Sequence, residues 1–96
     1  MFESQEVLAF KDIHPQAPVH VLLIPKQHIA DATELDSKNG SCLPGLFDAA
    51  NQVAREHQIH EKGFRLVINS KADGGQTVNH LHLHLIGGRR MTWPPG

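Results

Sequence analysis

Residues 80–86 read HLHLHLI, and this stretch decides how the rest of the sequence is interpreted. Leucine and histidine alternate strictly, which is the period of a β-strand, where successive side chains point to opposite faces. We therefore expect a strand whose leucines face the core and whose histidines share the other face. These residues are Leu81, Leu83 and Leu85, and His80, His82 and His84. At ~3.3 Å per residue, the outer two histidines of a straight strand lie about 13 Å apart.

Three histidines on one strand face favour a functional site over a solvated surface. Histidine has a pKa near neutrality and two distinct nitrogens, so it serves as nucleophile, proton carrier or metal ligand. An H-x-H pair could chelate zinc. The third histidine lies too far along the strand to join, and no carboxylate or thiolate partner is near in sequence. We therefore predict that the site holds no metal, with the metalloprotein kept as an alternative.

The pattern of three histidines fits nucleophilic catalysis better than metal binding. A hydrogen bond at one ring nitrogen of the central histidine would leave the other nitrogen as a free lone pair, and neighbouring histidines would oppose its protonation. Phosphorus bearing a good leaving group is a suitable electrophile for imidazole. The turn Gly74-Gly75-Gln76-Thr77 comes just before the histidines. Its glycines permit a phosphate cradle of backbone N–H groups.

The remaining elements predict an α+β fold. Apolar and β-branched runs predict strands over residues 7–10, 19–24 and 64–69. Apolar residues at helical spacing predict one long helix over residues 43–57. Asp31 is expected to cap a short helical turn that ends at Leu35. We therefore expect an antiparallel β-sheet meander with the long helix packed across it, in a single domain of residues 1–96.

Composition excludes several classes of protein. The 96 residues carry nine Lys and Arg against ten Asp and Glu, a net charge of −1, so we expect no nucleic-acid partner. The apolar runs are too short to cross a membrane, and the N-terminus does not resemble a secretory signal, so we expect a cytoplasmic protein. Cys42 is the single cysteine, which excludes an intramolecular disulfide and a CxxC zinc site.

The sequence resembles the histidine-triad superfamily, and within it the Hint-like nucleotide-binding branch. Residues 80–86 match the H-φ-H-φ-H-φ-φ signature, where φ is apolar. The resemblance extends through AFKDIHPQAPVHVLLIPKQHI at residues 9–29, GGQTVNHLHLHLIGGR at residues 74–89 and the terminal MTWPPG. It implies a HIT-like fold, a homodimer, and hydrolysis of purine nucleoside phosphoramidates through a nucleotidyl-histidine intermediate, with no cofactor.

The same resemblance implies roles for individual residues. His82 resembles the nucleophile, and His84 the residue that contacts the phosphate and handles the proton. His80 and His20 resemble residues that orient these two, and Thr77 one that contacts the leaving group. The implied contacts to phosphate, ribose and base are Gly75, Gln76, Asn69, Asp12, Phe10 and Ile13. Trp93 and Arg89 of the tail would shape leaving-group specificity across the dimer.

The chain is N-terminally short against the family pattern, which usually carries a further helix and strand that help to close the base pocket. We expect weaker base discrimination as a result. Two other functions stay open at this stage, a nucleotide-binding module with little turnover and a dinucleoside polyphosphate hydrolase. The remaining histidines, His14, His28, His57 and His60, are interpreted as structural or solvent-facing.

Overall fold

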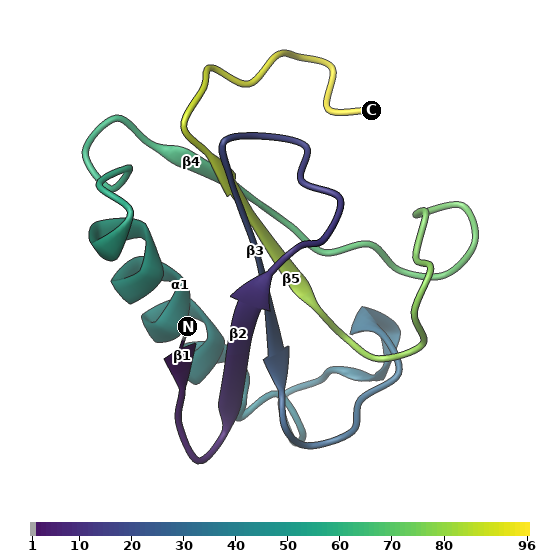
Figure 1. The fold of residues 1–96 in the computed structure, drawn as a ribbon. Helices are drawn as coiled ribbons and strands as arrows, with labels where there is room; N and C mark the ends of the chain where they lie inside the picture. The colour runs from purple at the N-terminus through teal and green to yellow at the C-terminus, as the bar shows by residue number, and fades with distance from the viewer. Residues whose placement is uncertain (1) are drawn as a thin grey trace.

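One antiparallel sheet and one long helix make up the molecule. The structure is a computed structural model that describes residues 2–96 (Figure 1). Within that range the strands are β1 (Phe2–Glu3), β2 (Val7–Lys11), β3 (Val19–Pro25), β4 (Phe64–Val67) and β5 (Leu83–Gly87). The helices are the short 3-10 helix η1 (Ala32–Glu34) and α1 (Leu43–Glu56). None of the helices over these residues is long and apolar enough to span a membrane.

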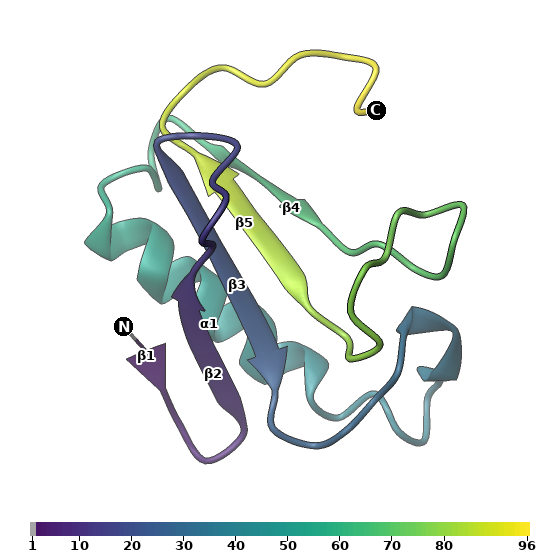
Figure 2. The same ribbon diagram turned by 45° about the vertical axis from the view of Figure 1, so that its right-hand side comes forward.

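The expected α+β architecture is confirmed. The strands are antiparallel as in a meander, but they do not all follow the order of the sequence. The order is β1-β2-β3-β5-β4, with every neighbouring pair antiparallel. The last strand in sequence therefore lies between β3 and β4 instead of at the edge (Figure 2). The leucines of β5 are buried on the sheet face that α1 covers.

The histidine stretch is only partly a strand, which corrects the prediction for residues 80–86. The strand begins at Leu83, and the three residues before it are irregular. In this irregular part the N–H of Leu81 donates to the carbonyl of Ile29, in the loop after β3, and not to a neighbouring strand. The leucines nevertheless stay buried, and His82 between them is buried as well. The leucines at 81, 83 and 85 are each 2% exposed or less.

The other predicted elements are found with shifted ends. The strands expected over residues 7–10 and 19–24 each extend by one residue, and the strand expected over residues 64–69 ends at Val67. Asp31 caps η1 as expected, because its carboxylate accepts the N–H of Thr33. The short β1 was not predicted, since two residues are too few to show a period.

The helix covers one face of the sheet and thereby leaves the other face for the site. Its buried side chains are Leu46, Ala49, Ala50, Val53 and Ala54. They pack against β2, β3 and β5. In the β3–β5 register, Val21 lies opposite Leu85 and Leu23 opposite Leu83, and all four are buried. The alternate residues of both strands point away from α1.

Both the loop over residues 12–18 and the tail after β5 lie at one end of the sheet (Figures 1 and 2). The loop over residues 70–80 lies toward the other end, near η1. The tail over residues 88–96 is irregular, as its prolines and glycines predict. The sheet face opposite α1 therefore has a loop at each end.

Leu85 anchors the histidine-bearing strand, and its truncation should destabilise the fold. It is fully buried, so Leu85→Ala leaves a cavity and should lower the free energy of unfolding by about 2–5 kcal/mol. Ile13→Ala is the matched control, because Ile13 is 86% exposed and should change stability by less than ~0.5 kcal/mol. Urea unfolding measures both. Equal stability of the two variants would contradict the position of Leu85 in the core.

Candidate active site

The pairing of β3 with β5 brings His20 and His84 together. His20 pairs with Ile86, and Leu22 pairs with His84, so the two histidines are diagonal neighbours on the face that α1 leaves open. Their ring centroids are 5.2 Å apart. Asp12 joins them, because its N–H donates to the His20 carbonyl at 3.0 Å and continues the β2–β3 pairing.

His82 has one ring nitrogen fixed by the backbone. Its Nδ1 lies 2.8 Å from the carbonyl oxygen of His80, and a carbonyl can only accept a hydrogen bond. Nδ1 of His82 therefore carries the proton. In the neutral ring the other nitrogen, Nε2, is an unprotonated lone pair. His82 is itself 9% exposed, so this tautomer is held in a largely enclosed position.

His20 and His84 form a directed hydrogen-bond chain. The N–H of Gln16 donates to Nδ1 of His20 at 3.0 Å, so the proton of neutral His20 is on Nε2. That Nε2 lies 2.9 Å from Nδ1 of His84 and 3.4 Å from a carboxylate oxygen of Asp12. Nδ1 of His84 thus accepts the hydrogen bond. The proton of neutral His84 is consequently on Nε2, which makes it a donor.

The surroundings of His84 favour its neutral form. Burial lowers the pKa of His84 below its ordinary value of 6.5, and the charges of protonated His82 and His20 lower it further. The carboxylate of Asp12 acts in the opposite direction. Crowded histidines were expected to oppose one another's protonation, and at His84 its neighbours His82 and His20 lower the pKa in this way.

His80 is anchored away from the other two histidines. Its Nε2 donates to the carbonyl of Pro25 at 2.9 Å, which leaves Nδ1 as an acceptor. Nδ1 of His28 lies 3.3 Å from that atom. His28 is exposed, as expected, but it also contacts a residue of the site. The His80 side chain therefore holds the backbone whose carbonyl fixes His82.

A cavity of about 540 Å³ opens beside the histidines. Its lining combines an apolar wall with polar groups at one side, as in many small-molecule sites. The lining residues are Phe10, Asp12, Ile13, Leu22, Ile24, Thr77, Val78, His80, His82 and His84. Seven of these belong to the predicted site. The three that sequence reasoning missed, Leu22, Ile24 and Val78, are apolar, and they resemble core residues until the sheet face opposite α1 is known.

Two more predicted residues lie in an adjoining hollow. His20 and Asn69 line it together with Gln16, Arg65 and Arg89. His84 belongs to both this hollow and the cavity, so it separates them. Asn69 is thus on the far side of His84 from the apolar wall.

The turn that was expected to cradle a phosphate uses two of its backbone N–H groups for hydrogen bonds within the turn. The N–H groups of Gly75 and Gln76 donate to the carbonyls of Ala72 and Lys71, within the turn itself. The amide side chain of Gln76 donates to the carbonyls of Ala30 and Val78. Neither Gly75 nor Gln76 lines the cavity. In this structure both residues shape the loop that carries Thr77.

Trp93 lies apart from the cavity as well. It is 80% exposed, and the guanidinium of Arg65 lies 6.0 Å from the centre of its ring. Arg65 also donates to the carbonyl of Thr92 at 2.8 Å. Arg65 thus holds the tail against β4, outside the site of its own chain.

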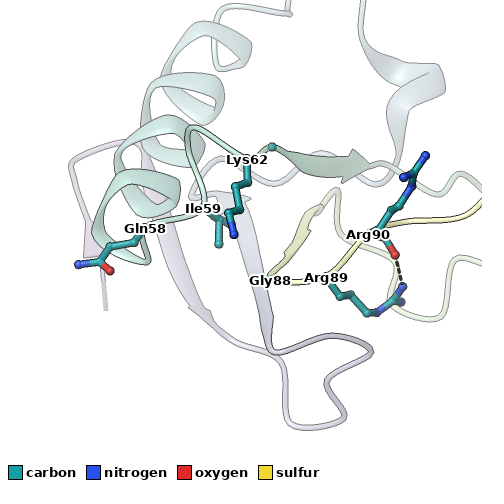
Figure 3. Close-up of a pocket in the computed structure, with 7 residues that line it drawn as sticks. Gln58, Ile59, Lys62, Gly88, Arg89 and Arg90 are labelled. Atoms are coloured by element: carbon teal, nitrogen blue, oxygen red, sulfur yellow. Dashed lines mark hydrogen bonds between the residues drawn. The ribbon is translucent and has the colours of Figure 1, made fainter.

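A second and larger hollow, of about 730 Å³, lies near the C-terminal end of α1 (Figure 3). Lys62, Arg89 and Arg90 contribute to it, together with Gln58, Ile59, Gly63 and Gly88. It includes none of the histidines. The candidate active site is therefore the smaller cavity, because the groups that can do chemistry lie there.

Asp12, His20 and His84 could be considered as metal ligands, because one donor atom from each lies within 4.8 Å of the others. Metal binding through Nε2 of His20 would require that nitrogen to lose its proton while Nδ1 still accepts from Gln16. A neutral imidazole cannot offer both nitrogens as acceptors. The three groups therefore fit a hydrogen-bonded relay better than a metal centre.

Comparison with known proteins gives one consistent result. Residues 1–91 match the family model described as the HIT domain. Arabidopsis thaliana has an adenylylsulfatase, HINT1, that is 47% identical over all of this chain and 66% of its own length. A 14 kDa zinc-binding protein of Brassica juncea is 46% identical over all of this chain and 86% of its own. The crystal structure of a HIT family hydrolase from Legionella pneumophila superposes with a TM-score of 0.96 at 48% identity, covering this whole chain and 86% of that one.

Because its pKa is lowered in the folded protein, His84 should make the free energy of unfolding decrease at acidic pH. We expect its ring to titrate below pH 6.5, so that at intermediate pH the unfolded chain binds a proton that the folded chain does not. This contribution to stability is complete above pH 6.5 and is lost as the pH falls toward the lowered pKa. Asp12→Asn should lower the pKa further, because the carboxylate raises it. Ring ¹⁵N shifts against pH measure both, and titration of His84 at or above 6.5 would contradict the assignment.

Proposed function

The chain belongs to the HIT domain family, in its Hint-like branch, and from this membership and the site we propose that it is a hydrolase of purine nucleoside phosphoramidates. The substrate would be a purine nucleoside monophosphate that carries an amine as leaving group. The reaction would pass through a nucleotidyl-histidine intermediate on His82. It needs neither a metal nor a cofactor.

One observation carries the proposal, the hydrogen bond between Nδ1 of His82 and the carbonyl of His80. This bond leaves Nε2 of His82 as a lone pair in a residue that lines the cavity. A nucleophile needs such an atom within reach of the substrate. Nε2 is thus the nitrogen of His82 that remains available to a substrate in the cavity.

In the proposed reaction, Nε2 of His82 attacks phosphorus, a phosphorus–nitrogen bond breaks, and the nucleotide is transferred to His82. Water then attacks phosphorus and releases the nucleoside monophosphate. Over the cycle one water molecule supplies the hydroxyl that ends on phosphorus and the proton that ends on the amine. His84 is suited to handle that proton, because its Nε2–H is the donor left free by the bond from His20.

Other residues of the cavity would contact the rest of the substrate. Phe10 and Ile13 lie in its apolar wall and would contact the base, while Asp12 would accept the ribose hydroxyls. Thr77 would contact the leaving group from the loop before the histidines. Ionised Asp12 offers acceptors only, which suits two vicinal hydroxyl donors.

The names of two relatives support a hydrolase, and one of them names an adenylyl substrate. The Arabidopsis protein is named an adenylylsulfatase, and the Legionella protein a HIT family hydrolase. An adenylyl group that carries a leaving group other than an amine would also fit the proposed site.

We also propose a homodimer, because β4 is an edge strand with only β5 beside it, and Phe47 of α1 is 44% exposed. In such a dimer Trp93 could reach the second site.

Two alternatives are kept because each predicts a different measurement. A nucleotide-binding module would bind AMP without turning over a phosphoramidate. A dinucleoside polyphosphate hydrolase would prefer diadenosine polyphosphates. The fixed tautomer of His82 favours turnover over mere binding, since binding a nucleotide does not require a nucleophilic lone pair.

His82→Ala should abolish turnover while nucleotide still binds. Release of AMP from adenosine 5′-phosphoramidate should fall on the order of 10³-fold or more, because the covalent route loses its nucleophile. AMP binding by calorimetry should be largely kept. His60→Ala is the matched control, since His60 is exposed and lies among residues after α1 that do not line the cavity.

Intact mass after a rapid quench should show an added nucleotidyl group on the wild type and on His60→Ala but not on His82→Ala. Turnover of His82→Ala at the wild-type rate would exclude His82 as nucleophile. AMP binding without AMP release by the wild type would favour the binding module, and faster cleavage of diadenosine tetraphosphate would favour the other hydrolase.

Activity should survive removal of divalent metals. The proton on Nε2 of His20 makes the Asp12–His20–His84 group a poor metal site, and the proposed reaction uses imidazole alone. Wild-type protein dialysed against EDTA should release AMP at its original rate, and added zinc should not increase that rate. Loss of activity in EDTA with recovery on stoichiometric zinc would overturn the metal-free reaction.

A further inference from the structure

Arg89 makes a contact that links the tail to the site of its own chain. It follows β5, and its guanidinium donates from Nη2 and Nε to the carbonyl of Gln16, at 3.0 and 3.3 Å. Gln16 belongs to the loop over residues 12–18, which is outside the sheet. A guanidinium that donates twice to one carbonyl restrains it more firmly than a single donor.

The residue that Arg89 holds is the one that fixes His20. Gln16 accepts from Arg89 through its carbonyl and donates through its N–H to Nδ1 of His20. The loop is also braced from within, by the N–H of His14 on the Asp12 carboxylate and by the Gln16 side chain on the His14 carbonyl. These internal contacts shape the loop but do not attach it to β5. Arg89 supplies that attachment.

We propose that Arg89 is a positioning residue for His84, acting through Gln16 and His20. By fixing the Gln16 carbonyl, it keeps the Gln16 N–H on Nδ1 of His20, which keeps the His20 proton on Nε2 and the His84 proton on Nε2. The arrangement of protons follows from the contacts alone. Its consequence for turnover rests on the proposed function.

Loss of this contact has a defined chemical effect. If Gln16 moved away, Nδ1 of His20 would be free to take the ring proton in part of the molecules, while the Asp12 carboxylate, 3.4 Å from Nε2, would still favour the proton on Nε2 in the others. Where Nδ1 takes the proton, Nε2 of His20 would be an acceptor, and Nδ1 of His84 would have to donate to it across the 2.9 Å contact. The single proton of neutral His84 would move to Nδ1. Nε2 of His84, the nitrogen left for substrate, would change from donor to lone pair.

The alternative reading of Arg89 as part of an anion site is less well supported. Lys62 and Arg90 line the same hollow, but Figure 3 shows the side chains of Arg89 and Arg90 extending in different directions. A further donor of Arg89, on Nη1, lies 3.3 Å from the carbonyl of Arg90. The guanidinium of Arg89 is thus directed to backbone oxygens of its own chain.

The experiment compares Arg89→Met with Arg90→Met in protein labelled with ¹⁵N-histidine. Both substitutions keep a long apolar stem and remove one positive charge at neighbouring positions, so they differ in the contact to Gln16. Long-range ¹H–¹⁵N correlation at a pH where the rings are neutral identifies the tautomer of each histidine. We expect wild type and Arg90→Met to show Nε2–H at His20 and His84, and Arg89→Met to show mixed tautomers at both.

Two further variants refine the test. Arg89→Lys should restore part of the wild-type pattern, because an ammonium can donate to the same carbonyl. Gln16→Pro removes the N–H that His20 accepts and should reproduce the Arg89→Met pattern, whereas Gln16→Ala keeps the N–H and should resemble wild type. If Gln16→Pro does not fold, the comparison of the two arginine variants decides alone.

Turnover supplies a separate readout. For Arg89→Met we expect kcat for adenosine phosphoramidate to fall about 10- to 100-fold, within the range of a lost proton donor, with KM little changed. Wild-type tautomers at His20 and His84 in folded Arg89→Met would overturn the positioning role, whatever the activity. Absence of AMP release by the wild type would instead count against the proposed function and leave the tautomer result to decide this inference.

Discussion

Burial of the alternating leucines before and within β5 is the constraint on which the site depends. Leu81, Leu83 and Leu85 are almost fully enclosed in the core that α1 helps to form. Burying a side chain of this size contributes about 1.5–3 kcal/mol, so together the three fix which face of the chain points inward. The histidines between them must then point to the open face. The same constraint operates although residues 80–82 are not part of a strand, because Leu81 is buried there without pairing in the sheet.

Backbone groups around the histidines determine which ring nitrogen of each one carries the proton. The carbonyls of His80 and Pro25 can only accept, and the N–H of Gln16 can only donate, so each fixes the proton of one ring. A hydrogen bond contributes about 0.5–1.5 kcal/mol net, and leaving a buried partner unpaired costs about 1–3 kcal/mol. These free energies favour one tautomer over the other at each ring. The fold thereby produces a lone pair on His82 beside a donor on His84.

The sequence predicted the parts of this arrangement that depend on local pattern. Alternation indicated the buried leucines, and helical spacing indicated α1. The match to the family signature predicted roles for His82 and His84, which remain predictions. The sequence could not show that Leu81 pairs with Ile29, because that contact joins segments far apart in the chain. For the same reason it missed Leu22 in the cavity wall and the link from Arg89 to Gln16. The sequence also did not show that the Gln76 side chain, which the resemblance places at the phosphate, donates to the carbonyls of Ala30 and Val78.

The most direct test of this account is the tautomer of His82 in the wild-type protein. Long-range ¹H–¹⁵N correlation spectra at a pH where the ring is neutral distinguish a protonated nitrogen from an unprotonated one. We expect a proton on Nδ1 of His82 and a free lone pair on Nε2, because Nδ1 donates to the carbonyl of His80. A ring that carries its proton on Nε2, or that exchanges evenly between the two forms, would contradict this expectation.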